Sequence, residues 1–180
     1  NGSIYKTTDG GSTWEPEMCC TRHAFKDVYA TDINNVWAVG LEGIINHSED
    51  GGETWMGQSL SLAEWLEGVY FTDDQTGWAV GHPGVILHTV DGGTNWAPQT
   101  SNSSPWLNEV WFFDNSTGWI CGQDGIVLHT VDGGQNWFDQ PTGTGLFLRD
   151  MHFLDASRGY VAGDQGLVLY TADGGTSWSE

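Results

Sequence analysis

The octapeptide TVDGGTNW at Thr89–Trp96 recurs almost unchanged as TVDGGQNW at Thr130–Trp137. Three further copies begin at Thr7, Ser48 and Thr171, and every copy keeps an Asp-Gly-Gly turn and a closing tryptophan. The copies follow one another at a constant interval of 41 residues. A constant period of about 40–45 residues is typical of a four-stranded propeller blade. The sequence therefore predicts a single repeat domain over residues 1–180.

Each repeat contains four short segments that have the composition of strands. In the first complete repeat they are FKDVYATD from Phe25, VWAVG from Val36, GIINHS from Gly43, and a segment that opens with the closing tryptophan. β-Branched and aromatic runs separated by Gly, Asn and Asp indicate strands and turns. We name the four predicted strands A, B, C and D in chain order. Strand C is apolar at consecutive positions, as in Val85–Leu87, which indicates burial on both faces. The predicted fold class is all-β, a β-propeller of four-stranded antiparallel blades.

The period divides the chain into four complete blades and one half-blade. The complete blades are predicted at residues 25–65, 66–106, 107–147 and 148–180, and residues 1–24 supply strands C and D of an earlier blade and a loop. Known propellers close with four to eight blades. We favour the interpretation that the chain is part of a larger propeller. The alternative is self-association, in which the unpaired edge of the half-blade contacts another chain.

The repeated octapeptide has a structural explanation as the hairpin between strands C and D. Its glycines permit positive φ angles, and its aspartate accepts backbone N–H groups across the turn. Its tryptophan gives each hairpin a large apolar anchor. We predict this structural role for ten residues: Asp9, Asp50, Asp91, Asp132, Asp173, Trp14, Trp55, Trp96, Trp137 and Trp178.

The octapeptide resembles the Asp-box, also called the bacterial neuraminidase repeat, which occurs in sialidases and many other propellers. The longer pattern GWAVGHPGVILHTVDGGTNW at Gly77–Trp96 is similar to the repeats of photosystem II stability and assembly factors. The resemblance covers nearly the whole chain and implies a propeller. It also implies an extracytoplasmic location, whether secreted, cell-surface, periplasmic or lumenal. It further implies a basic binding patch, whereas this chain contains only five Lys and Arg residues in total.

The charge balance restricts the classes of partner. The chain has 24 acidic and five basic residues, which gives a formal net charge of −19. Such a surface repels phosphate backbones and anionic lipids. We therefore expect no nucleic-acid partner. No apolar run approaches the about 20 residues of a membrane helix, so we expect no membrane insertion.

The sequence predicts no metal site and no cofactor. His47, His88 and His129 share one repeat position, but equivalent positions of successive blades stand apart and do not converge on one ion. The Asp-box aspartates also lie in separate blades, and no DxDxDG calcium loop occurs. Cys19 and Cys20 are adjacent and lack zinc-site spacing. Their redox state stays open between free thiols and a disulfide.

The positions that vary between repeats are the candidates for a specific binding surface. They lie at the entry to strand A and in the B–C connections, which we predict on the face opposite the Asp-boxes, together with the long D–A loops. The candidate binding residues are Trp65, Trp106, Phe147, Lys26, Glu67, Arg149, Glu42, His82, Asp124 and Asp164. Such an aromatic and acidic face suits a basic protein or a glycan. The alternative is that the aromatic residues only cap the blade interfaces.

The sequence favours a non-catalytic scaffold for protein binding or assembly. A sialidase would require an arginine triad, but Arg22, Arg149 and Arg158 are predicted on different segments that do not converge. A glycan-binding or sialidase-like glycosidase fragment is the first alternative, and a paired-carboxylate mechanism would use acids near the axis such as Glu67, Glu109 or Asp150. A surface or filament-forming structural protein is the second alternative.

Overall fold

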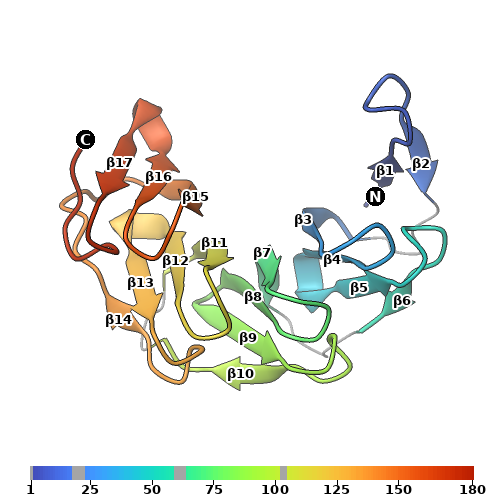
Figure 1. Ribbon diagram of the computed structural model, residues 1–180, viewed down its shortest axis with the longest axis horizontal. Helices are drawn as coiled ribbons and strands as arrows, with labels where there is room; N and C mark the ends of the chain where they lie inside the picture. Colours follow the sequence, from blue (N-terminus) through green and yellow to red (C-terminus); the bar gives the residue numbers. More distant parts are fainter. Residues whose placement is uncertain (1, 18–22, 59–63, 102–104) are drawn as a thin grey trace.

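The computed structural model describes residues 2–17, 23–58, 64–101 and 105–180, which form an open arc of antiparallel sheets (Figure 1). A two-stranded hairpin begins the arc, with β1 (Ile4–Lys6) and β2 (Glu15–Glu17). Three four-stranded sheets follow it. Their strands are β3 (Phe25–Ala30), β4 (Val36–Gly40), β5 (Ile45–Ser48) and β6 (Met56–Gly57), then β7 (Trp65–Phe71), β8 (Gly77–His82), β9 (Val85–Thr89) and β10 (Ala97–Gln99), then β11 (Leu107–Phe112), β12 (Gly118–Gly122), β13 (Val127–Thr130) and β14 (Phe138–Asp139).

The last sheet has three strands, β15 (Leu148–Phe153), β16 (Gly159–Gly163) and β17 (Val168–Thr171). Where the other repeats have a fourth strand, this repeat makes one isolated bridge between Tyr170 and Ser179. The all-β propeller architecture predicted from the repeats is otherwise confirmed. Among the described residues, no helix has the length and apolar character needed to traverse a bilayer.

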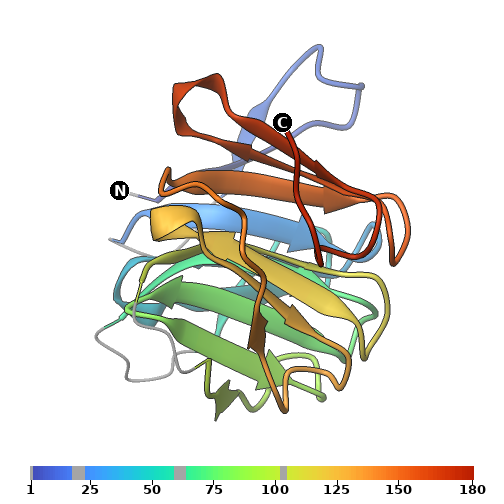
Figure 2. The ribbon, with the colours of Figure 1, turned by 90° about the vertical axis from the view of Figure 1, so that its left-hand side faces the viewer.

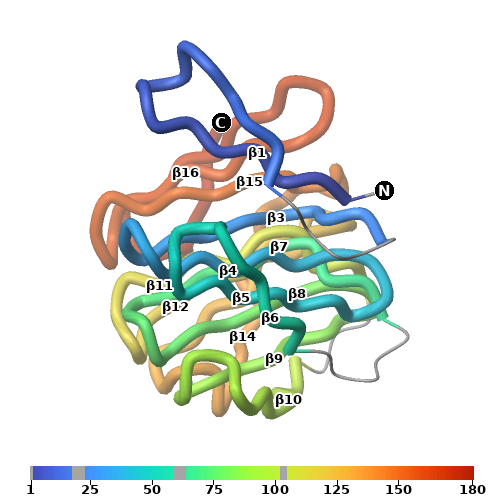
Figure 3. The backbone as a smooth tube through the Cα atoms, turned by 90° about the vertical axis from the view of Figure 1, so that its right-hand side faces the viewer, coloured from blue at the N-terminus to red at the C-terminus, as the bar shows by residue number. Residues whose placement is uncertain are grey.

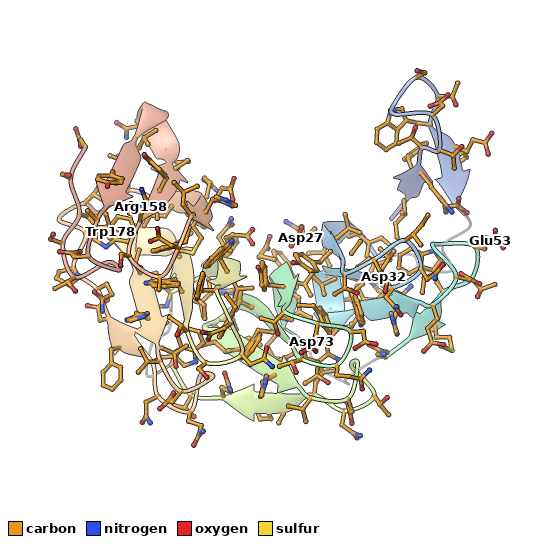
Figure 4. All side chains as sticks on the ribbon, in the orientation of Figure 1. Asp27, Asp32, Glu53, Asp73, Arg158 and Trp178 are labelled. Atoms are coloured by element: carbon orange, nitrogen blue, oxygen red, sulfur yellow. The ribbon has the colours of Figure 1, made fainter. Side chains whose placement is uncertain are left out.

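The inner strand of each blade carries a β-bulge near its start. The register with strand B shifts between Phe25 and Asp27 in β3, and the same shift recurs one repeat later between Leu66 and Gly68. The bulge leaves one residue unpaired and increases the local twist. Its consequence is that the residues at the start of strand A turn toward the inner side of the arc, where Figure 4 labels Asp27.

A three-ring stack joins each blade to the next. The indole of Trp37 lies between His47 of its own blade and Phe71 of the next, with centroid distances of 4.2 and 3.8 Å. The Trp37 Nε1–H also donates to the carbonyl oxygen of Gly92, in the next Asp-box turn. The same stack and hydrogen bond recur one and two repeats later, around Trp78 and Trp119. The histidine column is therefore part of the core, and burial lowers the pKa of His47.

The two ends of the arc lack this stack. Ala30 replaces the phenylalanine in the first blade, and Tyr160 replaces the tryptophan in the last. Val28 is 54% exposed, whereas its repeat equivalent Val69 is 1% exposed beneath the neighbouring blade. Tyr160 is 45% exposed at the other end. The exposure follows from position in the arc, because the first complete blade is preceded only by the two-stranded hairpin and no described blade follows the last one.

The turns lie at two opposite edges of the arc, which Figure 2 shows from the side. At one edge, the first Asp-box glycine of each of the four complete blades donates its N–H to the A–B turn of its own blade, as from Gly51 to the Asn34 carbonyl oxygen. At the other edge, the B–C turn contacts the entry to strand A, as from Leu41 N–H to the Ala24 carbonyl oxygen. The chain thus places the Asp-boxes on one edge and the B–C turns on the other. We call the second edge the loop face.

Candidate functional site

The loop face gathers most of the candidate binding residues. The N–H of Gln123 donates to the Trp106 carbonyl oxygen at 2.8 Å, and the N–H of Asp164 donates to that of Phe147 at 2.9 Å. These bonds fix each B–C turn beside the first residues of strand A. Trp65 is itself the first residue of β7, although the period assigns it to the preceding repeat.

An aromatic pocket lies on the loop face at the junction of the second and third blades. It has a volume of about 430 Å³ and is lined by Glu64, Trp65, His82, Pro83 and Trp106. The ring centroids of Trp65 and Trp106 lie 6.0 Å apart with 72° between their planes. His82 lies 4.6 Å from Trp106 by centroids. Three rings at steep mutual angles therefore enclose one pocket, and Trp65 remains 38% exposed.

The equivalent place in the fourth blade is filled by the chain itself. The guanidinium carbon of Arg149 lies 3.9 Å from the centroid of the Phe147 ring. The Asp164 carboxylate accepts two hydrogen bonds from this guanidinium, at 2.8 and 3.0 Å. The side-chain hydrogen bond from Arg149 lowers the pKa of Asp164. Arg149 is consequently neutralised by its own blade.

The other charged candidates are also paired or dispersed. Lys26 Nζ lies 3.2 Å from Glu67 Oε2 in the next blade. His23 Nδ1 lies 3.4 Å from Glu42 Oε2. Glu42 and Asp124 occupy equivalent B–C turns with φ near +60°. The structure therefore brings together Trp65, His82 and Trp106, and separately Phe147, Arg149 and Asp164, and it does not unite all ten candidates.

Three carboxylates lie close together near the start of the inner strands, those of Asp27, Glu109 and Asp150. The sequence singled out Glu109 and Asp150 as acids near the axis, but not Asp27. Asp27, Glu109 and Asp150 share one repeat position, and Gly68 stands in their place in the second blade. Burial is the main cause that raises the pKa of Glu109, to about 8, and the charges of Asp27 and Asp150 add to it. Burial likewise raises the pKa of Asp27. The signal in the sequence was a column directly after the strand-A bulge that is acidic in three of the four complete blades.

Asp27 also links two blades. Its carboxylate accepts the N–H of Val69 at 2.9 Å, beside the bulge at Gly68. A side chain at Gly68 would meet the Asn108 carbonyl oxygen at 2.8 Å from its Cβ. The close approach of the Asn108 backbone therefore explains why glycine and not an acid stands at position 68. The Asp27 carboxylate of the first blade accepts the neighbouring Val69 N–H instead.

The Asp-box aspartates are occupied within their own turns. Asp91 accepts the backbone N–H and the side-chain amide of Asn95, both at 2.8 Å. Thr89 donates its hydroxyl to Asp91 and accepts the N–H of Gly93. The side-chain hydrogen bond from Asn95 is the largest cause that lowers the pKa of Asp91. The equivalent bonds lower the pKa of Asp50 to about 2.

The Asp-box tryptophans differ in burial. Trp96 and Trp137 are buried and meet Phe71 and Phe112 edge to face, whereas Trp14 on the half-blade is 59% exposed. Trp55 and Trp178 are half-buried. The anchor is complete only where a neighbouring blade covers it.

The A–B turns carry a second repeated aspartate that the sequence analysis did not single out. Asp32 accepts the N–H groups of Asn34 and Asn35, and the same pattern recurs at the remaining members of the column, Asp73, Asp114 and Asp155. Figure 4 labels Asp32 and Asp73 at these turns. The last aspartate of this column, Asp155, also pairs with Arg158, whose Nη2 lies 2.7 Å from Asp155 Oδ2. Arg158 and Arg149 therefore belong to opposite edges of the arc and do not converge.

In the described ranges, no group of three or more His, Cys, Asp and Glu side chains is arranged to hold a metal ion. Cys121 is a buried free thiol. Cys19, Cys20 and Arg22 lie outside the described residues.

Solved structures similar to this chain include assembly factors and glycoside hydrolases. YCF48 bound to a D1 peptide matches with a TM-score of 0.66 and 16% identity, over 99% of this chain and 84% of that one. YCF48 from Cyanidioschyzon merolae matches with a TM-score of 0.58 and 17% identity, over 94% and 76%. An ancestral GH74 enzyme matches with a TM-score of 0.79 and 16% identity, over 97% of this chain but 28% of the enzyme. At these identities the likeness shows the fold.

No curated protein sequence matches the chain. A family model does match residues 55–146, and its description is photosynthesis system II assembly factor YCF48. These residues include the aromatic pocket and the two complete Asp-boxes at Thr89–Trp96 and Thr130–Trp137. The family expected from the repeats is therefore confirmed. Because the matched segment spans half of its length, the protein belongs to the photosynthesis system II assembly factor YCF48 family.

Proposed function

We propose that the protein is a non-catalytic scaffold that binds another protein through its loop face. The observation that carries the proposal is the aromatic pocket of Trp65, His82 and Trp106. Tryptophan is enriched among the residues that dominate binding energy at protein interfaces. Ligand sites are also typically concave and lined by aromatic side chains. A related fold has been solved with a D1 peptide bound, which supports a peptide or protein as the ligand class.

The partner in this proposal carries a basic segment. The net charge of −19 favours association with cations and speeds encounter with a positively charged surface. Among the described residues, the loop face offers no free arginine fork for an acidic peptide, since Arg149 is paired with Asp164. We also propose an extracytoplasmic location, because the repeats are widespread in extracytoplasmic proteins; fractionation of the native host tests that part.

Catalysis is the less supported alternative. A sialidase site needs clustered arginines, and both described arginines are paired with aspartates at opposite edges of the arc. The resemblance to GH74 enzymes concerns the fold alone. A glycan remains the alternative ligand of the aromatic pocket, and it is an outcome of the test below.

Selection from a phage-displayed library of random linear peptides tests the proposal. We expect basic peptides that bind the wild-type chain, and we expect Trp65→Ala with Trp106→Ala to weaken them by more than about 2 kcal/mol, or about 30-fold. Glu53→Lys is the matched control, because this exposed residue lies in an Asp-box turn at the opposite edge, where Figure 4 labels it. Peptides sensitive to Glu53→Lys but not to the double substitution would overturn the assignment of the loop face. Failure to select any peptide, with binding on a glycan array instead, would favour the glycan alternative.

A further inference from the structure

The aromatic pocket between the second and third blades is one member of a repeated set, and among the described residues it is the member that combines two tryptophans with a histidine. Its repeat position at the entry to strand A is Ala24, Trp65, Trp106 and Phe147 in the four blades. The facing position at the end of strand B or the start of the B–C turn is Leu41, His82, Gln123 and Asp164. Two tryptophans meet a histidine only at this junction.

The fourth blade shows what the same place accommodates. There the guanidinium of Arg149 stacks on Phe147 and pairs with Asp164, and these two residues are the repeat equivalents of Trp65 and His82 in the second blade. A cation held on an aromatic face beside a carboxylate is a favourable arrangement, and tryptophan is a better face than phenylalanine. The fold has therefore built one complete guanidinium site from its own residues.

The aromatic pocket offers aromatic faces and a carboxylate, as the Arg149 site does, but no cationic side chain lies in it. The repeat equivalents of Arg149 in the second and third blades are Glu67 and Asn108. Glu67 is paired with Lys26, and Asn108 donates its side-chain amide to the Arg149 carbonyl oxygen. Among the described residues no Lys or Arg lines the pocket, whereas Glu64 supplies a carboxylate.

The histidine in the pocket adds an unsatisfied polar atom. His82 Nδ1 is buried and has no hydrogen-bond partner among the described residues. A buried polar atom without a partner carries a desolvation cost that a ligand donor removes. The N–H groups of a guanidinium form a planar fork of such donors, and the same plane stacks on an indole.

We propose that this pocket binds the side chain of an arginine presented by the partner protein. The guanidinium stacks on Trp106 or Trp65, pairs with Glu64, and offers a donor to His82. This inference rests on the proposed function, since it names the chemical group that the loop face recognises. The charge complementarity is the net charge of −19 around a cationic ligand.

Titration with a blocked Gly-Arg-Gly peptide tests the inference, with the citrulline peptide as its neutral isostere. The readout is the ¹⁵N-indole signals of the tryptophans by NMR. We expect saturable shifts of the Trp65 and Trp106 signals, with the arginine peptide binding at least about threefold more tightly than the citrulline peptide. Trp14 is an internal control for unspecific contact, because it is more exposed than either and lies on the half-blade. Figure 3 shows that hairpin projecting beyond the first blade.

Two variants separate cation recognition from simple apolar contact. Trp106→Leu removes the shared aromatic face, and its fold is checked by thermal unfolding. Glu64→Gln keeps the shape of the pocket, and we expect it to weaken the arginine peptide while leaving the citrulline peptide unchanged. Equal binding of the two peptides, or shifts at Trp14 as large as those at Trp65, would overturn the inference. Library-selected peptides that still depend on both tryptophans would then leave the proposed function intact; conversely, arginine binding without any selected peptide would count against the proposed function alone.

Discussion

The indole of Trp78 lies nearly parallel to the ring of Phe112 in the next blade, with 3.5 Å between centroids and 11° between planes. The two residues are 34 positions apart, and His88 covers the other side of the indole. The Nε1–H of Trp78 also reaches the Gly133 carbonyl oxygen. One side chain therefore joins strand B of one blade, strand A of the next, and the next Asp-box turn.

We expect Trp78→Ala to lower the free energy of unfolding by about 3–5 kcal/mol, because it leaves a cavity between two blades and removes one of the two hydrogen bonds to the Gly133 carbonyl oxygen. Trp14→Ala is the matched control and should cost less than about 0.5 kcal/mol, since Trp14 is largely exposed. Urea denaturation of both variants measures the difference. Equal losses would mean that the stack contributes nothing beyond surface contact.

Asp91→Ala should lower the urea midpoint while leaving loop-face binding unchanged. Its carboxylate accepts two hydrogen bonds from Asn95 and one from Thr89 within the same turn. Asp91→Asn should lower the urea midpoint less than Asp91→Ala does, because one acceptor oxygen remains. A variant with an unaltered midpoint that had lost peptide binding would refute the structural role of this aspartate.

Glu109 should make the protein less stable as the pH rises through neutrality. Its pKa is raised from 4.5 to about 8 in the fold, so between these values only the folded state holds the proton. The folded state then binds more protons than the unfolded state, and stability falls as the pH increases across this window. We expect Glu109→Gln to flatten the dependence of the urea midpoint between pH 5 and pH 9. An unchanged slope in that variant would contradict the assignment.

The Asp-boxes have the opposite dependence. Hydrogen bonds in its own turn lower the pKa of Asp50 to about 2, so its contribution is present above the unfolded pKa of 3.8 and is lost as the pH falls toward 2. Asp50→Asn should therefore reduce the loss of stability in acid and leave the slope above pH 5 unchanged, which distinguishes it from Glu109→Gln.

The half-blade edge should contact another strand. Beside β1 lies a groove of about 290 Å³ lined by Ile4, Tyr5 and Val28, and the last two are largely exposed. Such an edge presents unpaired backbone groups to other chains. If copies associate there, solution mass should rise with concentration, and Val28→Glu should abolish the rise without changing the melting temperature. A monomer at all concentrations, with rapidly exchanging amides in residues 2–8 and no further strands in the native protein, would refute the prediction.

Sequence periodicity determined the architecture because the repeat is local. Each 41-residue unit encodes its own strands and its own turn, and the Thr89–Asp91–Asn95 hydrogen bonds close within seven residues. The same locality let the histidine column be assigned to the core from its position on middle strands, since equivalent residues of separate blades do not converge.

Tertiary structure alone decided the pairings between repeats. Alignment in register places Trp78 beside Trp37 and Trp119, but its actual partner is Phe112, because blades pack face to face with strand B of one against strand A of the next. The same geometry brought Trp65, His82 and Trp106 together in one pocket, whereas it placed Arg149 in an ion pair with Asp164. It also exposed Val28 and buried Val69, although both occupy one position of the repeat. A sequence column specifies which residue is present, whereas the number of neighbouring blades decides how much water that residue meets.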